Sequence, residues 1–156
     1  MTQVQSGMES IEPKLSDWTY KGRLFTSDMI EDNYGFVYII TNKENGRQYI
    51  GKKFFYSKKT KITKNKTNSR KSKRRFKTES DWRDYFGSSD ALKEDVLAKG
   101  EGLFTREIII LCKSKGECSY YEAKEQFERS VLFDDNYYNN WIQCKIHSSH
   151  LRKKPV

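Results

Sequence analysis

The fold is decided by the stretch GFVYIITNKENGRQYIG, residues 35–51. After Gly35, β-branched and aromatic residues continue to Thr41, and this composition is typical of a strand. Asn45-Gly46 is a strong hairpin signal, because both residues accept the positive φ angles of a tight turn. The segment 47–51 predicts the returning strand, so the stretch as a whole predicts a β-hairpin.

The register of this hairpin decides which side chains share a face. A two-residue turn at 45–46 would place Tyr38 opposite Lys53, and a four-residue turn ending at the same glycine preserves the parity. Because strand side chains alternate between faces, Tyr38, Tyr49 and Lys53 are expected on one face. Gly51 would let a backbone or a ligand approach closely. Geometry alone leaves open that the two tyrosines simply pack in a core.

The rest of the chain predicts a small α+β domain with a central, mostly antiparallel three-stranded sheet flanked by helices. A helix is expected from a cap at Ser89 or Asp90, and a second over Ser119–Phe133, with an apolar stripe of Tyr120, Ala123, Phe127 and Val131. The other expected elements are a cap over 17–32 with a helical turn at 26–28, a buried strand over 104–111 and a last short strand over 137–146.

Positive charge is concentrated in one segment. The 156-residue chain has a net charge of +9, and residues 52–77 hold 13 Lys or Arg with no Asp or Glu. The remainder holds 17 basic and 21 acidic residues. This segment is rich in Thr, Ser and Asn, and we expect a long, mobile loop. DNA is the expected partner, because its phosphates neutralise such charge and release counterions. A solvated loop without a specific partner is the alternative.

The cysteines and the termini indicate a cytoplasmic protein. Three cysteines form no disulfide framework, and neither a signal peptide nor a membrane span is expected. The expected organisation is a disordered tail over 1–16, a domain over 17–146 and a basic tail over 147–156. Zinc is a weak alternative, since Cys112, Cys118, Cys144 and His147 are loosely spaced.

Two triplets connect this sequence to a known family. Phe36-Val37-Tyr38 and Tyr49-Ile50-Gly51, ten residues apart, resemble the paired motif of the GIY-YIG nucleases. The first triplet departs from the motif at Phe36, where glycine is usual. The resemblance runs from about Gly35 to Ile146 and extends to phage-type members, related to the Seg endonucleases of T4-like phages. The further segments that carry it are Tyr49-Ile50-Gly51-Lys52-Lys53, Glu79-Ser80-Asp81-Trp82, Tyr85-Phe86-Gly87-Ser88-Ser89 and Tyr137-Tyr138-Asn139.

The resemblance implies a metal-dependent DNA endonuclease in the cytoplasm, that of the host cell if the gene is phage-encoded. Tyr38 would act as general base towards water, and Tyr49 would support it. A nearby cation would favour the phenolate and offset charge in the transition state. Lys53 with Arg75 is favoured for this cation over Arg74 and Arg83. One Glu and waters would hold a single Mg²⁺, or Mn²⁺ in its place.

The remaining site residues follow from the same resemblance. Glu122 is ranked first as the metal ligand, followed by Glu128 and Glu125. Asn139 resembles an Asn near the family's site, and its alternative role is that of a turn residue. DNA phosphates would be contacted by Lys52, Lys58, Lys59, Arg70, Lys71, Lys73 and Arg74.

Two other functions stay open at this point. The chain could be a degenerate nuclease fold that binds DNA or RNA through the basic loop without cleaving it. It could also present that loop to an acidic protein. No separate DNA-reading domain is recognisable, so specificity would come from the core, the basic loop, a homodimer or a partner protein.

Overall fold

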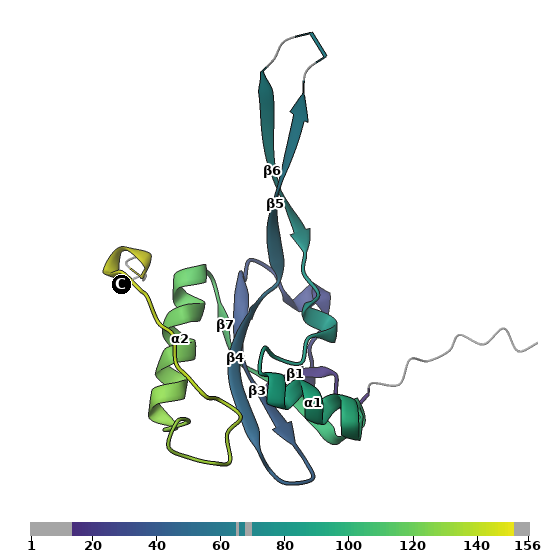
Figure 1. Cartoon of the computed structure of the whole chain (residues 1–156), viewed down its shortest axis with the longest axis vertical. Coiled ribbons are helices and arrows are strands. Elements are labelled where there is room, and N and C mark those ends of the chain that lie inside the picture. The colour runs from purple at the N-terminus through teal and green to yellow at the C-terminus, as the bar shows by residue number, and fades with distance from the viewer. Residues whose placement is uncertain (1–13, 65, 68–69, 152–156) are drawn as a thin grey trace, which may run out of the picture.

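A five-stranded mixed sheet forms the centre of the computed structural model, which describes residues 14–64, 66–67 and 70–151 (Figure 1). Its strand order is β2-β1-β7-β3-β4, and β1 runs parallel to β7 while the other neighbours are antiparallel. The bounds are Trp18–Tyr20 for β1, Arg23–Leu24 for β2, Gly35–Asn42 for β3, Gln48–Phe54 for β4 and Phe104–Cys112 for β7.

The expected three-stranded sheet is therefore incomplete. Its three strands are β7, β3 and β4, and the structure adds β1 and β2 from the segment expected to be only a cap. These two strands have three and two residues, too few to show an alternating pattern in the sequence. Tertiary packing holds them: the Trp18 side chain is buried, and its indole N–H donates to the carbonyl of Trp82.

The two α-helices cover opposite faces of the sheet (Figure 1). Helix α1 spans Asp90–Lys99, and the Ser89 side chain caps it as expected by accepting from the Leu92 N–H. Helix α2 spans Lys115–Glu128. Short 3₁₀ helices complete the chain: η1 at Ser27–Met29, in the expected place, η2 at Trp82–Asp84, η3 at Glu101–Leu103 and η4 at Ser148–His150.

Helix α2 begins and ends earlier than its apolar pattern predicts. Ser114 caps it by accepting from the Glu117 N–H, one turn before the expected start. The predicted stripe is wrong at Tyr120 and Phe127, which are exposed. The buried face carries Cys118, Ala123 and Gln126 instead. Gln126 can lie on this face because the sheet offers its side chain a hydrogen-bond partner.

Each face of the sheet has its own core. The larger core is aromatic and contains Trp18, Phe36, Tyr38, Phe55 and Trp82, together with α1 residues. The smaller core lies under α2 and includes Val37, Ile39 and Ile50. Alternate residues of β3 thus enter different cores, which follows from the two-residue repeat of a strand.

The hairpin of β3 and β4 has the four-residue turn. Tyr38 pairs with Gly51 and Thr41 with Gln48, so the two-residue turn that would pair Tyr38 with Lys53 is wrong. The Asn42 side chain accepts from the Glu44 N–H, and the Asn42 carbonyl accepts from the Gly46 N–H, which closes the longer turn. Parity is kept, and Tyr38, Tyr49 and Lys53 lie on the face of the aromatic core.

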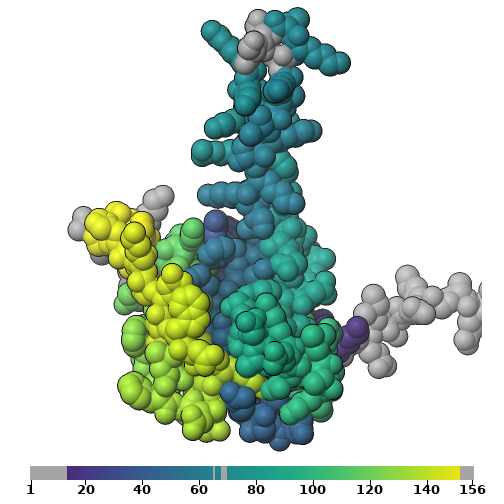
Figure 2. All heavy atoms as spheres, viewed as in Figure 1, coloured from purple at the N-terminus to yellow at the C-terminus, as the bar shows by residue number. Residues whose placement is uncertain are grey.

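The basic segment is a β-ribbon where the sequence indicated a mobile loop. Strand β5, Tyr56–Lys64, pairs with β6, Lys71–Glu79, along the full length of both strands. The ribbon projects from the body as an arm (Figures 1 and 2). Backbone hydrogen bonds between the two strands, which composition does not reveal, give this charged segment its regular structure.

The ends of the domain differ from expectation in detail. Ser16 is buried, and its carbonyl accepts from the Arg106 guanidinium, so the folded unit includes this residue; residues 1–13 of the predicted tail lie outside the described residues. The last expected strand reduces to a single parallel bridge between Gln48 and Tyr137. Of the basic tail, 152–156 lie outside the described part. No helix in that part is long and apolar enough to cross a membrane.

Gly51 lies where the two tyrosines leave no room for a side chain. A Cβ atom there would overlap the Tyr38 hydroxyl and lie 2.9 Å from a ring carbon of Tyr49. We expect Gly51→Ala to lower the free energy of unfolding by about 1–3 kcal/mol, the usual cost of overpacking. Urea denaturation measures this. Gly102→Ala is the control, because a Cβ there meets open space. Equal stability of the two variants would contradict the close packing of the tyrosines.

Candidate active site

A cavity of about 490 Å³ lies beside the edge strand β4. It is bordered by β4, by the start of α1, by α2 and by the segment 138–143, and Figure 2 shows that segment in yellow near α1 in green. The polar and aromatic side chains that line it are Tyr49, Lys52, Ser88, Ser89, Asp90, Glu122, Gln126, Tyr138, Asn139, Asn140, Trp141 and Gln143. Segments far apart in the sequence therefore meet at one place.

Of the two motif tyrosines, only Tyr49 lines this cavity. Its hydroxyl is 2.8 Å from the Ser88 hydroxyl. Tyr38 is 1% exposed and lies behind it, with the ring centroids 6.2 Å apart. Burial raises the pKa of both phenols, for Tyr38 well above its usual value, and neighbouring phenols raise it further. Both tyrosines are therefore neutral at pH 7.

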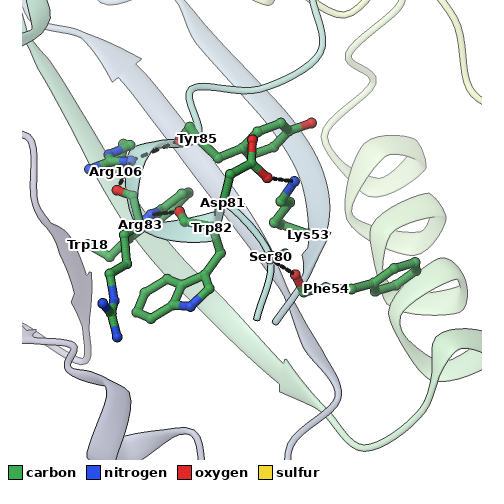
Figure 3. Close-up of polar contacts among 9 residues, drawn as sticks. All are labelled: Trp18, Lys53, Phe54, Ser80, Asp81, Trp82, Arg83, Tyr85 and Arg106. Carbon is green, nitrogen blue, oxygen red and sulfur yellow. Dashed lines mark hydrogen bonds and ion pairs between the residues drawn. The ribbon is translucent and has the colours of Figure 1, made fainter. Parts of the chain in front are cut away.

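Lys53 was expected to lower the pKa of these phenols, but its charge is engaged elsewhere. Its ammonium group is 2.6 Å from an Asp81 carboxylate oxygen and 4.0 Å from the centre of the Tyr85 ring (Figure 3). The bond from Lys53 lowers the pKa of the Asp81 carboxyl. The charge of Lys53 is thus matched by a carboxylate on the segment that carries Tyr85.

Arg106 fixes this segment from the other side. Its guanidinium donates to the carbonyls of Arg83 and Tyr85 at 2.8 and 2.9 Å (Figure 3). Burial lowers its pKa to about 10. Arg106 therefore holds η2 and positions Tyr85. The ring of Tyr85 in turn packs against that of Tyr38, with the two ring centroids 6.0 Å apart. Arg106 has no role predicted from the sequence, because a single Arg in a strand carries no motif.

The arginines considered for catalysis lie away from the cavity. Arg75 pairs with Thr60 and Arg74 with Lys61, both within the arm. Arg83 forms an ion pair with Glu79 at 3.0 Å. None of the three lines the cavity. The structure does not bring them to the tyrosines.

Lys52 is the cation that lines the cavity. Its ammonium group is 3.1 Å from a carboxylate oxygen of Glu122. Lys52 was predicted to contact DNA phosphates, and its place at the cavity was not predicted. The available signal was parity: Lys52 and Lys53 are consecutive on β4, so their side chains point to opposite faces, and the face of Lys52 is the one that α2 covers.

Glu122 is the one of the three candidate glutamates at the cavity. Its side chain is 13% exposed, and burial raises the pKa of its carboxyl while Lys52 opposes that rise. Glu125 pairs with Arg129 at 3.0 Å, and Glu128 lies 3.7 Å from Lys124 on the solvent side. The structure thus places the first-ranked glutamate at the cavity, and its role as metal ligand stays a prediction.

Asn139 and Gln126 hold the backbone of Ile50 between Tyr49 and Gly51. The Ile50 N–H donates to the Asn139 side chain at 3.1 Å, and the Ile50 carbonyl accepts from Asn139 at 2.8 Å and from Gln126 at 3.0 Å. Asn139 is buried, so it acts here as a clamp on the edge strand and not as an ordinary turn residue. The sequence gave no reason to select Gln126.

A comparison with protein families matches residues 18–142 to the family described as "Putative endonuclease segE, GIY-YIG domain". The chain belongs to this family. Neither a curated protein nor a solved structure matched it. The match spans β1 to the segment after Asn139, so it includes all the residues that line the cavity except Gln143.

Oxygen donors at this GIY-YIG cavity suit a hard divalent cation. Glu122 supplies a carboxylate, and the buried side-chain oxygen of Gln126 has no hydrogen-bond partner among the described residues. Mg²⁺ prefers oxygen ligands, keeps several waters and is usually bound in proteins through one or two carboxylates together with substrate phosphates. Within the described ranges, no three His, Cys, Asp or Glu gather in a cluster that could hold a metal, so the cysteines assemble no zinc site there.

Removal of the Asn139 side chain tests the clamp. Asn139→Ala deletes two hydrogen bonds to Ile50 and leaves its buried peptide groups without these partners. We expect the free energy of unfolding to fall by about 1–3 kcal/mol. The matched control is Asn140→Ala, an exposed neighbour, which should change it by less than about 0.5 kcal/mol. Urea denaturation of both variants measures the difference; equal values would mean that Asn139 is only a turn residue.

Proposed function

We propose that this protein is a Mg²⁺-dependent endonuclease that hydrolyses phosphodiester bonds in DNA. One observation carries the proposal: in a GIY-YIG chain, a phenol, an amine and a carboxylate meet in one cavity. These groups are Tyr49, Lys52 and Glu122. Hydrolysis of a phosphodiester needs a base or hydrogen bond for the attacking water, and it needs positive charge for the phosphate.

Glu122 and the side-chain oxygen of Gln126, which has no hydrogen-bond partner in the described ranges, would hold the divalent ion. When bound, that ion would stabilise negative charge on the leaving oxygen. Mn²⁺ has the same preference for oxygen ligands and is expected to replace it. Lys52, which contacts Glu122 in the free protein, would then face the phosphate and offset its charge in the transition state.

The two tyrosines take different catalytic roles in this proposal because their exposure differs. The family resemblance implied Tyr38 as the general base and Tyr49 as its support. Because Tyr49 lines the cavity and Tyr38 is buried behind it, we assign contact with the attacking water to Tyr49 and positioning to Tyr38. Water oxygen forms the new bond to phosphorus, the bond to the leaving oxygen breaks, and the Tyr49 phenolate takes the proton from water.

A plasmid nicking assay with Mg²⁺ or Mn²⁺ tests the activity. We expect Glu122→Gln to lower the cleavage rate at least about 100-fold, because it removes the carboxylate at the cavity. Glu128→Gln is the matched control, since this glutamate lies on the solvent side of the same helix. It should cleave like the wild type. Wild-type protein that is inactive on a broad DNA panel, or a Glu122→Gln variant that cleaves normally, would refute the proposal.

Two tyrosine variants test which tyrosine is the general base. Tyr49→Phe should lower the rate constant for cleavage about 100-fold or more, the usual contribution of a general base, and Tyr38→Phe should lower it less. Tyr120→Phe, on the exposed side of α2, is the control. A larger loss of cleavage rate in Tyr38→Phe than in Tyr49→Phe would mean that Tyr38 is the general base.

The pH profile of the wild type completes this test. Burial raises the pKa of Tyr49 above 10, so the phenolate is scarce at pH 7 and grows tenfold with each pH unit. The cleavage rate should therefore rise about tenfold per unit between pH 7 and 9. A flat profile would show that the phenol only orients water.

The alternative is a catalytically degenerate module that binds nucleic acid with the same fold. One observation favours it: no residue of β5 or β6 lines the cavity, so binding through the arm would not need the catalytic groups. Such a module would bind DNA without metal, in a salt-sensitive manner, and yield no products.

A further inference from the structure

The arm has the size of a groove-binding element. Strands β5 and β6 pair over nine residues each, from Tyr56 opposite Glu79 to Lys64 opposite Lys71. At about 3.3 Å per residue the ribbon is about 26 Å long. One turn of B-form DNA is about 34 Å. The arm thus reaches along most of one helical turn.

Both faces of the arm carry cations. The pairing register places six on one face, which we call the six-cation face: Lys58, Lys64, Lys71, Lys73, Arg75 and Lys77. Lys59, Lys61 and Arg74 lie on the other face, beside Phe76. All nine cations are exposed, and among the described residues none forms an ion pair.

This arrangement is costly without a polyanion. Lys58 lies directly opposite Lys77, Lys61 opposite Arg74 and Lys64 opposite Lys71, and like charges in such pairs destabilise a sheet. Neutralisation by phosphates removes the repulsion and releases counterions. A partner with phosphates on two sides of the ribbon fits both charged faces.

The major groove of B-form DNA meets these requirements. It is about 12 Å wide and admits a two-stranded ribbon, whose faces then lie towards the phosphates of both walls. The major groove of A-form RNA is too narrow and deep for side chains. Ile62 lies on the six-cation face and Phe76 on the other face, and both side chains are exposed.

A basic surface connects the arm to the candidate active site. A second cavity, of about 410 Å³, lies at the base of the arm and is lined by Lys52, Lys53, Lys58 and Lys115. Lys52 also lines the cavity that contains Tyr49 and Glu122. A phosphate backbone that leaves the arm therefore meets cations up to the candidate site.

We propose that the β5–β6 ribbon inserts into the major groove of duplex DNA and guides the adjoining phosphate backbone towards the β4 cavity. This proposal rests on DNA as the substrate of the proposed function. The binding step itself needs neither metal nor catalysis, so it can be measured separately from cleavage.

The first test removes charge from the six-cation face. The variant combines Lys73→Gln, Arg75→Gln and Lys77→Gln, and a matched control combines Lys43→Gln, Lys93→Gln and Lys145→Gln, three exposed lysines of the body. Binding of the full chain to a 30-base-pair duplex is measured in EDTA at several salt concentrations. The slope of log K against log salt should weaken by about 3 in the arm variant, one unit per lost contact. The control should keep the wild-type slope.

The second test identifies the groove. Dimethyl sulfate methylates guanine N7 in the major groove and adenine N3 in the minor groove. Wild-type protein should protect guanine N7, and the arm variant should not. Protection of adenine N3 alone, equal binding to a matched RNA duplex, or an arm variant that binds like the control would each overturn the proposal.

The outcomes separate this proposal from the proposed function. N7 protection without any cleavage would support the arm and refute the endonuclease. Metal-dependent cleavage with full binding and cleavage by the arm variant would support the endonuclease and refute the arm.

Discussion

The peptide groups of Ile50 are held from outside the sheet, and the position of the site depends on this. Strand β4 lies at the edge, where one side of its backbone lacks a neighbouring strand. Asn139 and Gln126 supply the missing partners by bonding to the Ile50 N–H and carbonyl. An edge strand with its hydrogen bonds satisfied is fixed in position. Tyr49 and Lys52 flank this point, so their side chains are fixed relative to α2 and the segment after it.

The same clamp explains the unusual face of α2. Gln126 faces the sheet because its amide N–H reaches the Ile50 carbonyl, and Glu122, one turn earlier, faces it because Lys52 lies opposite. A buried polar side chain is tolerated only where it has a partner. The side-chain oxygen of Gln126 is the exception, because it is buried beside the cavity and has no hydrogen-bond partner within the described part of the chain. Gln126 is thus buried on this helix beside Cys118 and Ala123, while the large apolar Phe127 is exposed.

Most of the exposed cations and the side chains that line the cavity lie in different parts of the chain. Residues 52–77 carry the entire positive excess, and most of them lie in the β5–β6 arm. The body holds Tyr49, Lys52 and Glu122 with few unpaired charges around them: Lys52 pairs with Glu122 and Lys53 with Asp81. Long-range attraction needs exposed charge, whereas a positioned site needs charges whose partners fix their geometry. The separation meets both needs, and Lys52, at the junction, belongs to both regions.

The sequence by itself determined the β3–β4 hairpin, the shared face of Tyr38, Tyr49 and Lys53, the Ser89 cap of α1 and the strand before α2, because each depends on local turn chemistry or strand parity. It also ranked Glu122 first, through a family pattern.

Only the tertiary structure decided that Tyr38 is buried and Tyr49 accessible, that Lys52 meets Glu122, and that Gln126 faces the cavity. It also decided that the basic segment forms two paired strands. These features depend on contacts between residues that are separated along the chain, such as Tyr56 with Glu79, 23 positions apart, and Ile50 with Asn139, 89 positions apart. Composition and periodicity describe neighbours along the chain and contain no information on such pairs.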